Sequence, residues 1–211
     1  MTRIVYLHGF ASSPQSSKAQ FFRRKFAALG IDITIPRLDE GRFEETTVSR
    51  QLAVIEREAA DEPVILMGSS LGGYLAALYA SRHRKVEKLV LMAPAFEFPT
   101  GFAARFSPEQ CEQWKRAGSF PFFHNGENRE ALLGYGFLTD ARSLPVPVDF
   151  AQPALVLHGT RDEVVPAAVS ERFAASHPNV TLRLLASGHE LTDVVEVLWS
   201  ETAAFLGYQN R

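Results

Sequence analysis

The pentapeptide Gly68-Ser69-Ser70-Leu71-Gly72 constrains the fold more than any other stretch of this sequence. An apolar run with β-branched members precedes it, and an alanine-rich apolar run over residues 71–80 follows it, so the stretch predicts a strand, a sharp turn and a helix. Such a turn exposes the hydroxyl of its central serine, and the flanking glycines let the two backbones pass closely. The Gly-x-Ser-x-Gly motif also occurs by chance in flexible loops, but the strand and helix predicted around it favour Ser70 as a nucleophile.

Strand and helix patterns alternate along most of the chain. Strands are predicted over residues 5–10, 31–36, 64–67, 86–92, 153–158 and 180–185. Helices are predicted over residues 18–29, 44–60, 71–80 and 167–176, and from residue 186 to about residue 205. This alternation predicts an α/β fold with a mostly parallel sheet, helices on both faces and ligands at the carboxyl ends of the strands. The length of 211 residues fits a single domain, residues 1–211.

An aromatic-rich segment at about residues 96–150 interrupts the alternation. Its rings fall among Gly, Pro and polar residues, without the long apolar run of a buried strand. We expect a small cap that covers the site and excludes water. The alternative is that the rings mainly pack the insertion against the core, as aromatic side chains commonly do.

Composition excludes several classes of protein. A formal net charge of −2 gives no basic footprint for nucleic acid, and no apolar run is long enough for a membrane span. The single cysteine, Cys111, has no partner for an internal disulfide, lacks the neighbours of a metal site or a Cys/His nucleophile, and is interpreted as a plain thiol. The first residues carry no secretory signal pattern, so we expect a cytoplasmic protein.

Three residues that follow predicted strands form a candidate catalytic triad, in the order Ser70, Asp162, His189. A serine hydroxyl is a poor nucleophile unless an adjacent base removes its proton, which is the role predicted for His189. Asp162 would hold the imidazole in the correct tautomer and stabilise its cation. Because loops at one edge of a parallel sheet converge, residues far apart in sequence can meet there.

Other acids and histidines compete for these roles. Glu97 follows the strand after the predicted turn and is the main alternative to Asp162, whereas Glu163 should point away. The position of His158 at the end of a central strand favours a packed, hydrogen-bonded role for its ring. The remaining histidines are expected to be structural: His8 bracing a turn, His83 beyond a helix, His124 in the insertion and His177 on a surface loop.

With these residues placed, the chain resembles the α/β-hydrolase superfamily over essentially its whole length. The stretch from Leu7 to Pro14 with Lys18-Ala19 resembles small bacterial esterases of the YqiA type. The insertion from Trp114 to Ala141 is similar to the group that contains the mitochondrial acyl-glucuronide esterase and depalmitoylase relatives. Many relatives have Met where this chain has Leu71, a change that leaves a backbone amide unaffected.

The resemblance implies a serine hydrolase that cleaves carboxylic esters or thioesters through an acyl-enzyme, without a cofactor or a metal. It also implies that the backbone N–H groups of Phe10 and Leu71 form the oxyanion hole. The expected partner is a small-molecule acyl ester or thioester; the sequence does not fix the oligomeric state. Two alternatives stay open: another chemistry on the same fold, such as perhydrolysis or carbon–carbon bond hydrolysis, and a non-catalytic ligand-binding member.

Overall fold

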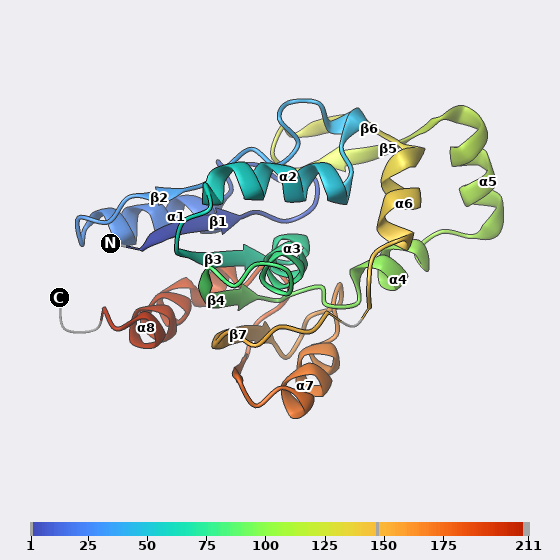
Figure 1. The fold of residues 1–211 in the computed structure, drawn as a ribbon. Coiled ribbons are helices and arrows are strands. Elements are labelled where there is room, and N and C mark those ends of the chain that lie inside the picture. The colour runs from blue at the N-terminus through green and yellow to red at the C-terminus, as the bar shows by residue number, and fades with distance from the viewer. Residues whose placement is uncertain (1, 147, 209–211) are drawn as a thin grey trace.

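A six-stranded sheet forms the centre of the molecule in a computed structural model that describes residues 2–146 and 148–208 (Figure 1). The strand order is β2-β1-β3-β4-β7-β8, and every neighbouring pair is parallel. The strands are β1 (Arg3–Leu7), β2 (Ile33–Thr34), β3 (Val64–Ser69), β4 (Val86–Met92), β7 (Ala154–Gly159) and β8 (Val180–Leu185). The predicted parallel α/β sheet is therefore present, with its carboxyl ends at one edge.

Alternating residues of the central strands build two apolar layers, one on each face of the sheet. Along β1, Ile4 and Tyr6 contact one layer, and Val5 and Leu7 contact the other, as the two-residue repeat of a strand requires. Helices α1 (Ser17–Ala27) and α8 (Val195–Leu206) cover the first face. The second is covered by α2 (Val48–Ala59), α3 (Leu71–Ala80) and α7 (Ala167–Ser176).

Several element boundaries differ from the sequence-based expectation. The strand expected over residues 5–10 is β1, which ends at Leu7, so that His8, Gly9 and Phe10 lie in the loop after it. The strand expected over residues 31–36 is reduced to β2, and the helix expected over residues 44–60 is divided into the 3₁₀ turn η1 (Phe43–Glu45) and α2. Thr47 sets the start of α2, because its side chain accepts a hydrogen bond from the Arg50 amide at 3.1 Å. The helix expected from residue 186 starts only at α8, after a loop and the 3₁₀ turn η2 (Thr192–Val194).

The segment between β4 and β7 forms an insertion between two strands of the sheet, and we call it the cap. Its elements are α4 (Phe98–Ala103), α5 (Pro108–Ala117), β5 (Ser119–His124), β6 (Arg129–Gly134) and α6 (Tyr135–Arg142). β5 and β6 pair as an antiparallel hairpin, where the sequence suggested no strand. The hairpin is hard to recognise in the sequence because exposed Pro121 and Phe123 alternate with the inward-facing Phe120 and Phe122.

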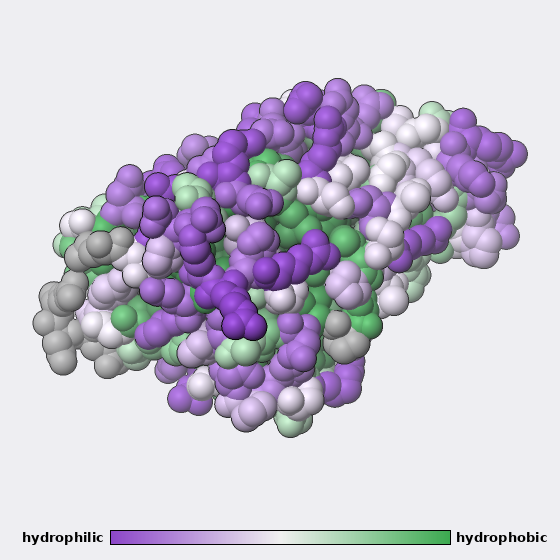
Figure 2. All heavy atoms as spheres, in the orientation of Figure 1, coloured by the Kyte–Doolittle hydropathy of each residue, from purple (hydrophilic) through white to green (hydrophobic). Residues whose placement is uncertain are grey.

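The cap shares one hydrophobic core with the sheet. Fully buried Trp114, Leu133 and Phe137 of the cap belong to the same cluster of buried residues as Val5 and Leu66 of the strands. The buried indole N–H of Trp114 has a hydrogen-bond partner, because Nε1 donates to the Leu133 carbonyl at 2.9 Å. In the orientation of Figure 1, apolar surface gathers where the cap meets the sheet, whereas the far end of the cap is hydrophilic (Figure 2). The aromatic side chains of the cap therefore pack the cap against the sheet.

None of the helices in the described part of the chain combines the length and apolar character needed to cross a bilayer.

Candidate active site

Ser70 lies in a strained turn between β3 and α3. Its backbone has φ 54° and ψ −117°, a region that non-glycine residues rarely adopt, and it is held there by hydrogen bonds on both sides. The Ser70 amide donates to the Met92 carbonyl at 2.9 Å, and the Ser70 carbonyl accepts from the Ala95 amide at 3.1 Å. The turn is thus tied to the end of β4 and to the residues after it, and Ser70 is partly exposed.

The two flanking glycines are required by close backbone approach. A Cβ atom on Gly68 would lie 2.2 Å from the Gly72 carbonyl oxygen, and one on Gly72 would lie 2.1 Å from the Leu7 carbonyl oxygen. Real Cβ atoms do not come this close, so only glycine lets α3 start directly against β3 and β1.

Asp162 follows β7 and its carboxylate is held by backbone amides. Oδ1 accepts from the amides of Val164 at 2.9 Å and Val165 at 2.8 Å. Burial by itself would raise the pKa of Asp162, but these amides and the ring of His189 outweigh it, and the pKa lies below its ordinary value. The group is therefore a carboxylate at neutral pH.

His189 joins the acid and the serine. Its Nδ1 lies 2.7 Å from Asp162 Oδ2, and its Nε2 lies 3.0 Å from Ser70 Oγ. Because a carboxylate only accepts, Nδ1 carries the proton, which leaves Nε2 free to accept from the serine hydroxyl. The structure thus brings together the three side chains that the sequence proposed, within proton-transfer distance.

The loops that carry Asp162 and His189 are joined to each other. The Arg161 amide donates to the Ser187 carbonyl at 2.9 Å, and the Arg161 guanidinium donates to the Ala186 carbonyl at 2.7 Å. A Cβ atom on Gly159 would lie 2.4 Å from the Ser187 oxygen, so the loops after β7 and β8 pack backbone to backbone. This contact fixes the separation of acid and base.

His158 adds a contact to the acid that sequence reasoning did not find. The fully buried ring places Nε2 3.1 Å from Asp162 Oδ2 and 2.9 Å from the Val165 carbonyl, and Nδ1 2.7 Å from Ser170 Oγ. Since both groups at Nε2 are acceptors, Nε2 carries the proton and Nδ1 accepts from the serine hydroxyl. The packed, hydrogen-bonded role expected for His158 is present, and the His-x-x-x-Asp spacing of the 158–162 turn was its only sequence signal.

The competing acids lie elsewhere. Glu97 is exposed and pairs with Arg172 of α7 at 2.9 Å, and Glu163 is exposed on the loop beside Asp162. Neither has a recorded contact with His189 in the described part of the chain.

The other histidines make structural contacts. His8 Nδ1 donates to the Gly9 carbonyl at 3.0 Å, and Nε2 accepts from the Leu38 amide at 3.3 Å, which is the turn-bracing role expected for it. His83 stacks on Tyr79 with ring centroids 3.8 Å apart. His177 is more packed than a surface loop residue, because it stacks on Phe173 at 3.9 Å and lies against the Phe173 carbonyl.

The two residues predicted to supply the oxyanion hole are Leu71, which directly follows Ser70, and Phe10, which follows Gly9; a Cβ atom on Gly9 would lie 3.5 Å from Ser70 Cβ. Leu71 is the first residue of α3, where helix geometry leaves the amide without an intrahelical acceptor. Phe10 follows β1, whose end runs alongside β3 in the sheet, and its ring packs against Phe102, Phe122 and Phe137 of the cap at 5.3 to 5.5 Å. Their role in catalysis stays a prediction.

One group of described residues has side chains close enough to hold a metal ion. Asp39, His124 and Glu127 each offer a ligand atom, all within 4.8 Å of one another. Two of these atoms, Asp39 Oδ2 and His124 Nε2, have no hydrogen-bond partner in the structure, which suits a cation. Both carboxylates are already paired with guanidinium groups, Asp39 with Arg37 and Glu127 with Arg37 and Arg129. The charge there is balanced without a metal, so we interpret the group as an ion-pair network.

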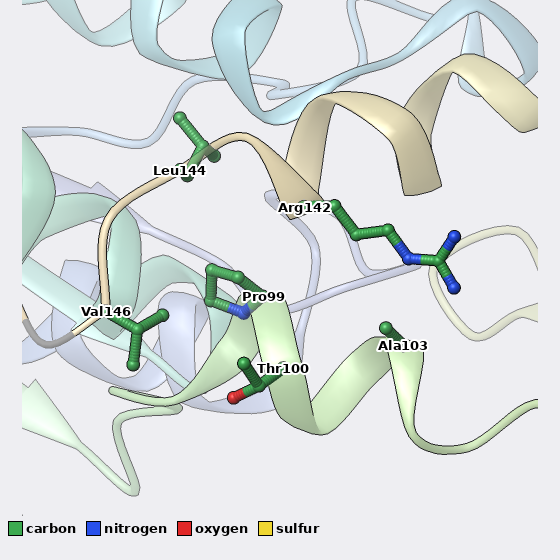
Figure 3. Close-up of a pocket in the computed structure, with 6 residues that line it drawn as sticks. All are labelled: Pro99, Thr100, Ala103, Arg142, Leu144 and Val146. Atoms are coloured by element: carbon green, nitrogen blue, oxygen red, sulfur yellow. The ribbon is translucent and has the colours of Figure 1, made fainter.

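A pocket of about 480 Å³ is lined by residues of the segment between β4 and β7. It is formed by α4 and the segment around the end of α6 (Figure 3). Its lining residues are Pro99, Thr100, Ala103, Arg142, Leu144 and Val146. Because neither Ser70, Asp162 nor His189 lines it, this pocket does not define where a scissile bond would bind.

Comparison with known proteins places the chain in a family. The model of the uncharacterised protein family UPF0227 matches residues 3–206. The chain belongs to this family. This UPF0227 protein is also similar to mitochondrial palmitoyl-protein thioesterase ABHD10. The Bos taurus relative is 27% identical over 215 residues, covering 92% of this chain and 69% of the relative. The Homo sapiens relative is 27% identical over 218 residues, covering 92% and 69%.

Solved structures agree with the fold. The mouse alpha/beta hydrolase domain-containing protein 10 superposes with a TM-score of 0.77 at 24% identity, over 97% of this chain and 89% of that one. Est1E from Butyrivibrio proteoclasticus, solved with ferulic acid bound, gives a TM-score of 0.82 at 20% identity, over 99% and 89%. The predicted α/β-hydrolase fold, the hydrolase class and the resemblance to the depalmitoylase group are thereby confirmed. The palmitoyl-protein thioesterase ABHD10 relatives are named as mitochondrial, and the cytoplasmic location of this chain stays a prediction.

Proposed function

We propose that this UPF0227 protein is a serine hydrolase that cleaves carboxylic esters or thioesters through Ser70, His189 and Asp162. The observation that carries the proposal is the continuous chain of contacts from Ser70 Oγ to His189 Nε2 at 3.0 Å and from His189 Nδ1 to Asp162 Oδ2 at 2.7 Å. Nucleophile, base and orienting acid in this geometry are the parts that acyl transfer requires. Relatives named as thioesterases support the substrate class.

Acylation begins when Ser70 Oγ attacks the carbonyl carbon of the ester or thioester and passes its proton to His189 Nε2. Asp162 stabilises the imidazolium that forms. The tetrahedral intermediate then collapses, the carbon–oxygen or carbon–sulfur bond breaks, and His189 returns the proton to the leaving alcohol or thiol. Ser70 is left as an acyl ester.

Deacylation repeats the sequence with water. His189 accepts a proton from the water as it attacks the acyl-enzyme, and then protonates Ser70 Oγ as the carboxylic acid leaves. In both steps the oxyanion is assigned to the amides of Phe10 and Leu71, each contributing roughly 3 kcal/mol of transition-state stabilisation. No cofactor takes part in this scheme.

Replacing Ser70 with alanine tests the proposal directly. The variant should hydrolyse p-nitrophenyl acetate at least about 10³-fold more slowly than the wild type, because nucleophilic attack is lost while binding is retained. A fluorophosphonate probe should label the wild type at Ser70, as mapped by peptide mass spectrometry, and should not label Ser70→Ala.

Ser69→Ala is the matched control. Ser69 is the buried neighbour of the nucleophile, and its side chain is hydrogen-bonded to that of Tyr6 on β1. This variant should keep both labelling and turnover. Equal turnover by Ser70→Ala and the wild type would refute the nucleophile assignment, and a wild type that is neither labelled nor active would favour a ligand-binding protein.

A further inference from the structure

The loop that carries Phe10 contains a strained residue directly after it. Ala11 has φ 48°, a left-handed conformation that is unfavourable for a residue with a Cβ atom. Such conformations persist only where the surrounding structure holds them. The position of the Phe10 amide therefore depends on what supports Ala11.

The tip of the cap hairpin supplies that support. Gly126, in the turn between β5 and β6, donates its amide hydrogen to the Ala11 carbonyl at 3.2 Å. A Cβ atom on Gly126 would lie 2.6 Å from Ser13 Cβ and 2.8 Å from both the Ser12 carbonyl carbon and the Ser13 nitrogen. The turn and the loop are thus in backbone contact, with no room for a side chain between them.

A second set of contacts fixes the hairpin tip itself. Glu127, the next residue, pairs with Arg37, and Arg37 Nε donates to Asp39 Oδ1 at 2.8 Å. His124, at the other side of the turn, is buried with Nε2 3.5 Å from Asp39 Oδ2 and its ring 4.7 Å from that of Phe43. The segment after β2 therefore holds the tip from one side.

The same segment also reaches the strand end that precedes Phe10. The Leu38 amide donates to His8 Nε2, and the ring of Phe10 lies 5.4 Å from that of Phe122 on β5. The loop after β1, the segment after β2 and the hairpin tip form one closed arrangement, in which each holds the other two.

We propose that the hairpin tip of the cap positions the Phe10 amide for oxyanion stabilisation, with Gly126 and Glu127 as positioning residues. This inference rests on the proposed function, since it assigns a purpose to an amide that acts only if Ser70 forms tetrahedral intermediates. The cap then contributes to the rate of the chemical step and not only to enclosure of substrate. A small displacement of an oxyanion donor is enough to slow catalysis strongly.

The test compares Gly126→Ala with Gly136→Ala. Gly126 does not have a positive φ, so its substitution acts through the backbone contact alone, and a Cβ on Gly136 in α6 of the same cap meets nothing within 4 Å. Rates of p-nitrophenyl ester hydrolysis are normalised to active sites titrated with a fluorophosphonate. Gly126→Ala should lower kcat about 10-fold or more with KM within about threefold. Gly136→Ala should match the wild type.

A boronic acid inhibitor separates positioning from general structural damage. It forms a tetrahedral adduct with the serine, so its Ki should rise in Gly126→Ala by about the factor that kcat falls, as expected of a transition-state analogue. Unchanged kcat and Ki in a folded, active-site-titrated Gly126→Ala would overturn the inference and leave the proposed function intact. An inactive wild type would overturn both.

A charge substitution decides the matter if Gly126→Ala does not fold. Glu127→Gln removes the ion pair with Arg37 but keeps the shape of the side chain, and Glu130→Gln is its control, because Glu130 is exposed on the adjacent strand β6. Glu127→Gln should lower kcat several-fold without a matching rise in KM, and Glu130→Gln should not. A kcat for Glu127→Gln equal to that of the wild type would overturn the proposal.

Discussion

At the scale of single residues, the site depends on histidines whose tautomers are set by their hydrogen-bond partners. His189 presents Nε2 to Ser70 because Asp162 holds Nδ1, and His158 donates to the same carboxylate oxygen, Oδ2. His8 is held neutral, because burial lowers its pKa to about 4. In each of these three rings, both nitrogens have a hydrogen-bond partner, as buried polar atoms generally require.

Removing His158 should destabilise the protein. In His158→Leu, the Asp162 carboxylate and the Ser170 hydroxyl both lose a buried partner, so the free energy of unfolding should fall by about 2–3 kcal/mol, measured by urea denaturation. His83→Gln changes a partly exposed ring outside this network and should alter stability by only about 0.5 kcal/mol. A His158→Leu protein as stable as the wild type would contradict the assigned donor role.

His8 should make stability depend on pH. The pKa of His8 is about 4 in the folded protein and 6.5 in the unfolded chain, so as pH falls from 6.5 to 4 the unfolded chain takes up a proton that the folded protein does not. Stability is complete above pH 6.5 and should decrease by about 3 kcal/mol on reaching pH 4. Comparing urea unfolding of the wild type and His8→Asn across this range isolates the effect, and parallel pH profiles would disprove it.

At the scale of elements, the sequence predicted those whose pattern is local. Residues 71–80, 86–92, 167–176 and 180–185 form helices or strands with the expected limits. The predicted start of the last helix was wrong. Apolar periodicity alone would begin the helix earlier, but Leu191 has φ 54°, which is not a helical conformation. The hairpin of the cap was not predicted. Its inward-facing residues pack against other residues of the cap, and the sequence of the two strands alone does not indicate those partners.

The start of α3 is the element boundary least tolerant of change. Gly72→Ala would place a Cβ atom 2.1 Å from the Leu7 carbonyl oxygen at the end of β1, and backbone on both sides would have to move. We expect a loss of about 3 kcal/mol or more in the free energy of unfolding. Gly101→Ala in α4 meets no atom within 4 Å and should be neutral or slightly stabilising. Thermal or urea denaturation of the two variants checks the contrast.

At the scale of the whole molecule, parallel topology accounts for what could be predicted of the site. Ser70, Asp162 and His189 follow β3, β7 and β8, whose carboxyl ends share one edge, so their order in the chain was sufficient to pair them. The contact of Gly126 with Ala11 could not be predicted in this way. It arises because the tip of the cap hairpin packs against the loop after β1, and no periodicity or motif near residue 126 indicates a partner more than a hundred residues away.

The shortness of β2 has a consequence for behaviour at high concentration. This outermost strand leaves the sheet after Thr34, two residues ahead of Pro36, which has no amide hydrogen to give. An edge so brief offers a second molecule almost no template for extending the sheet, and intermolecular β-aggregation from this side is therefore disfavoured without any covering helix.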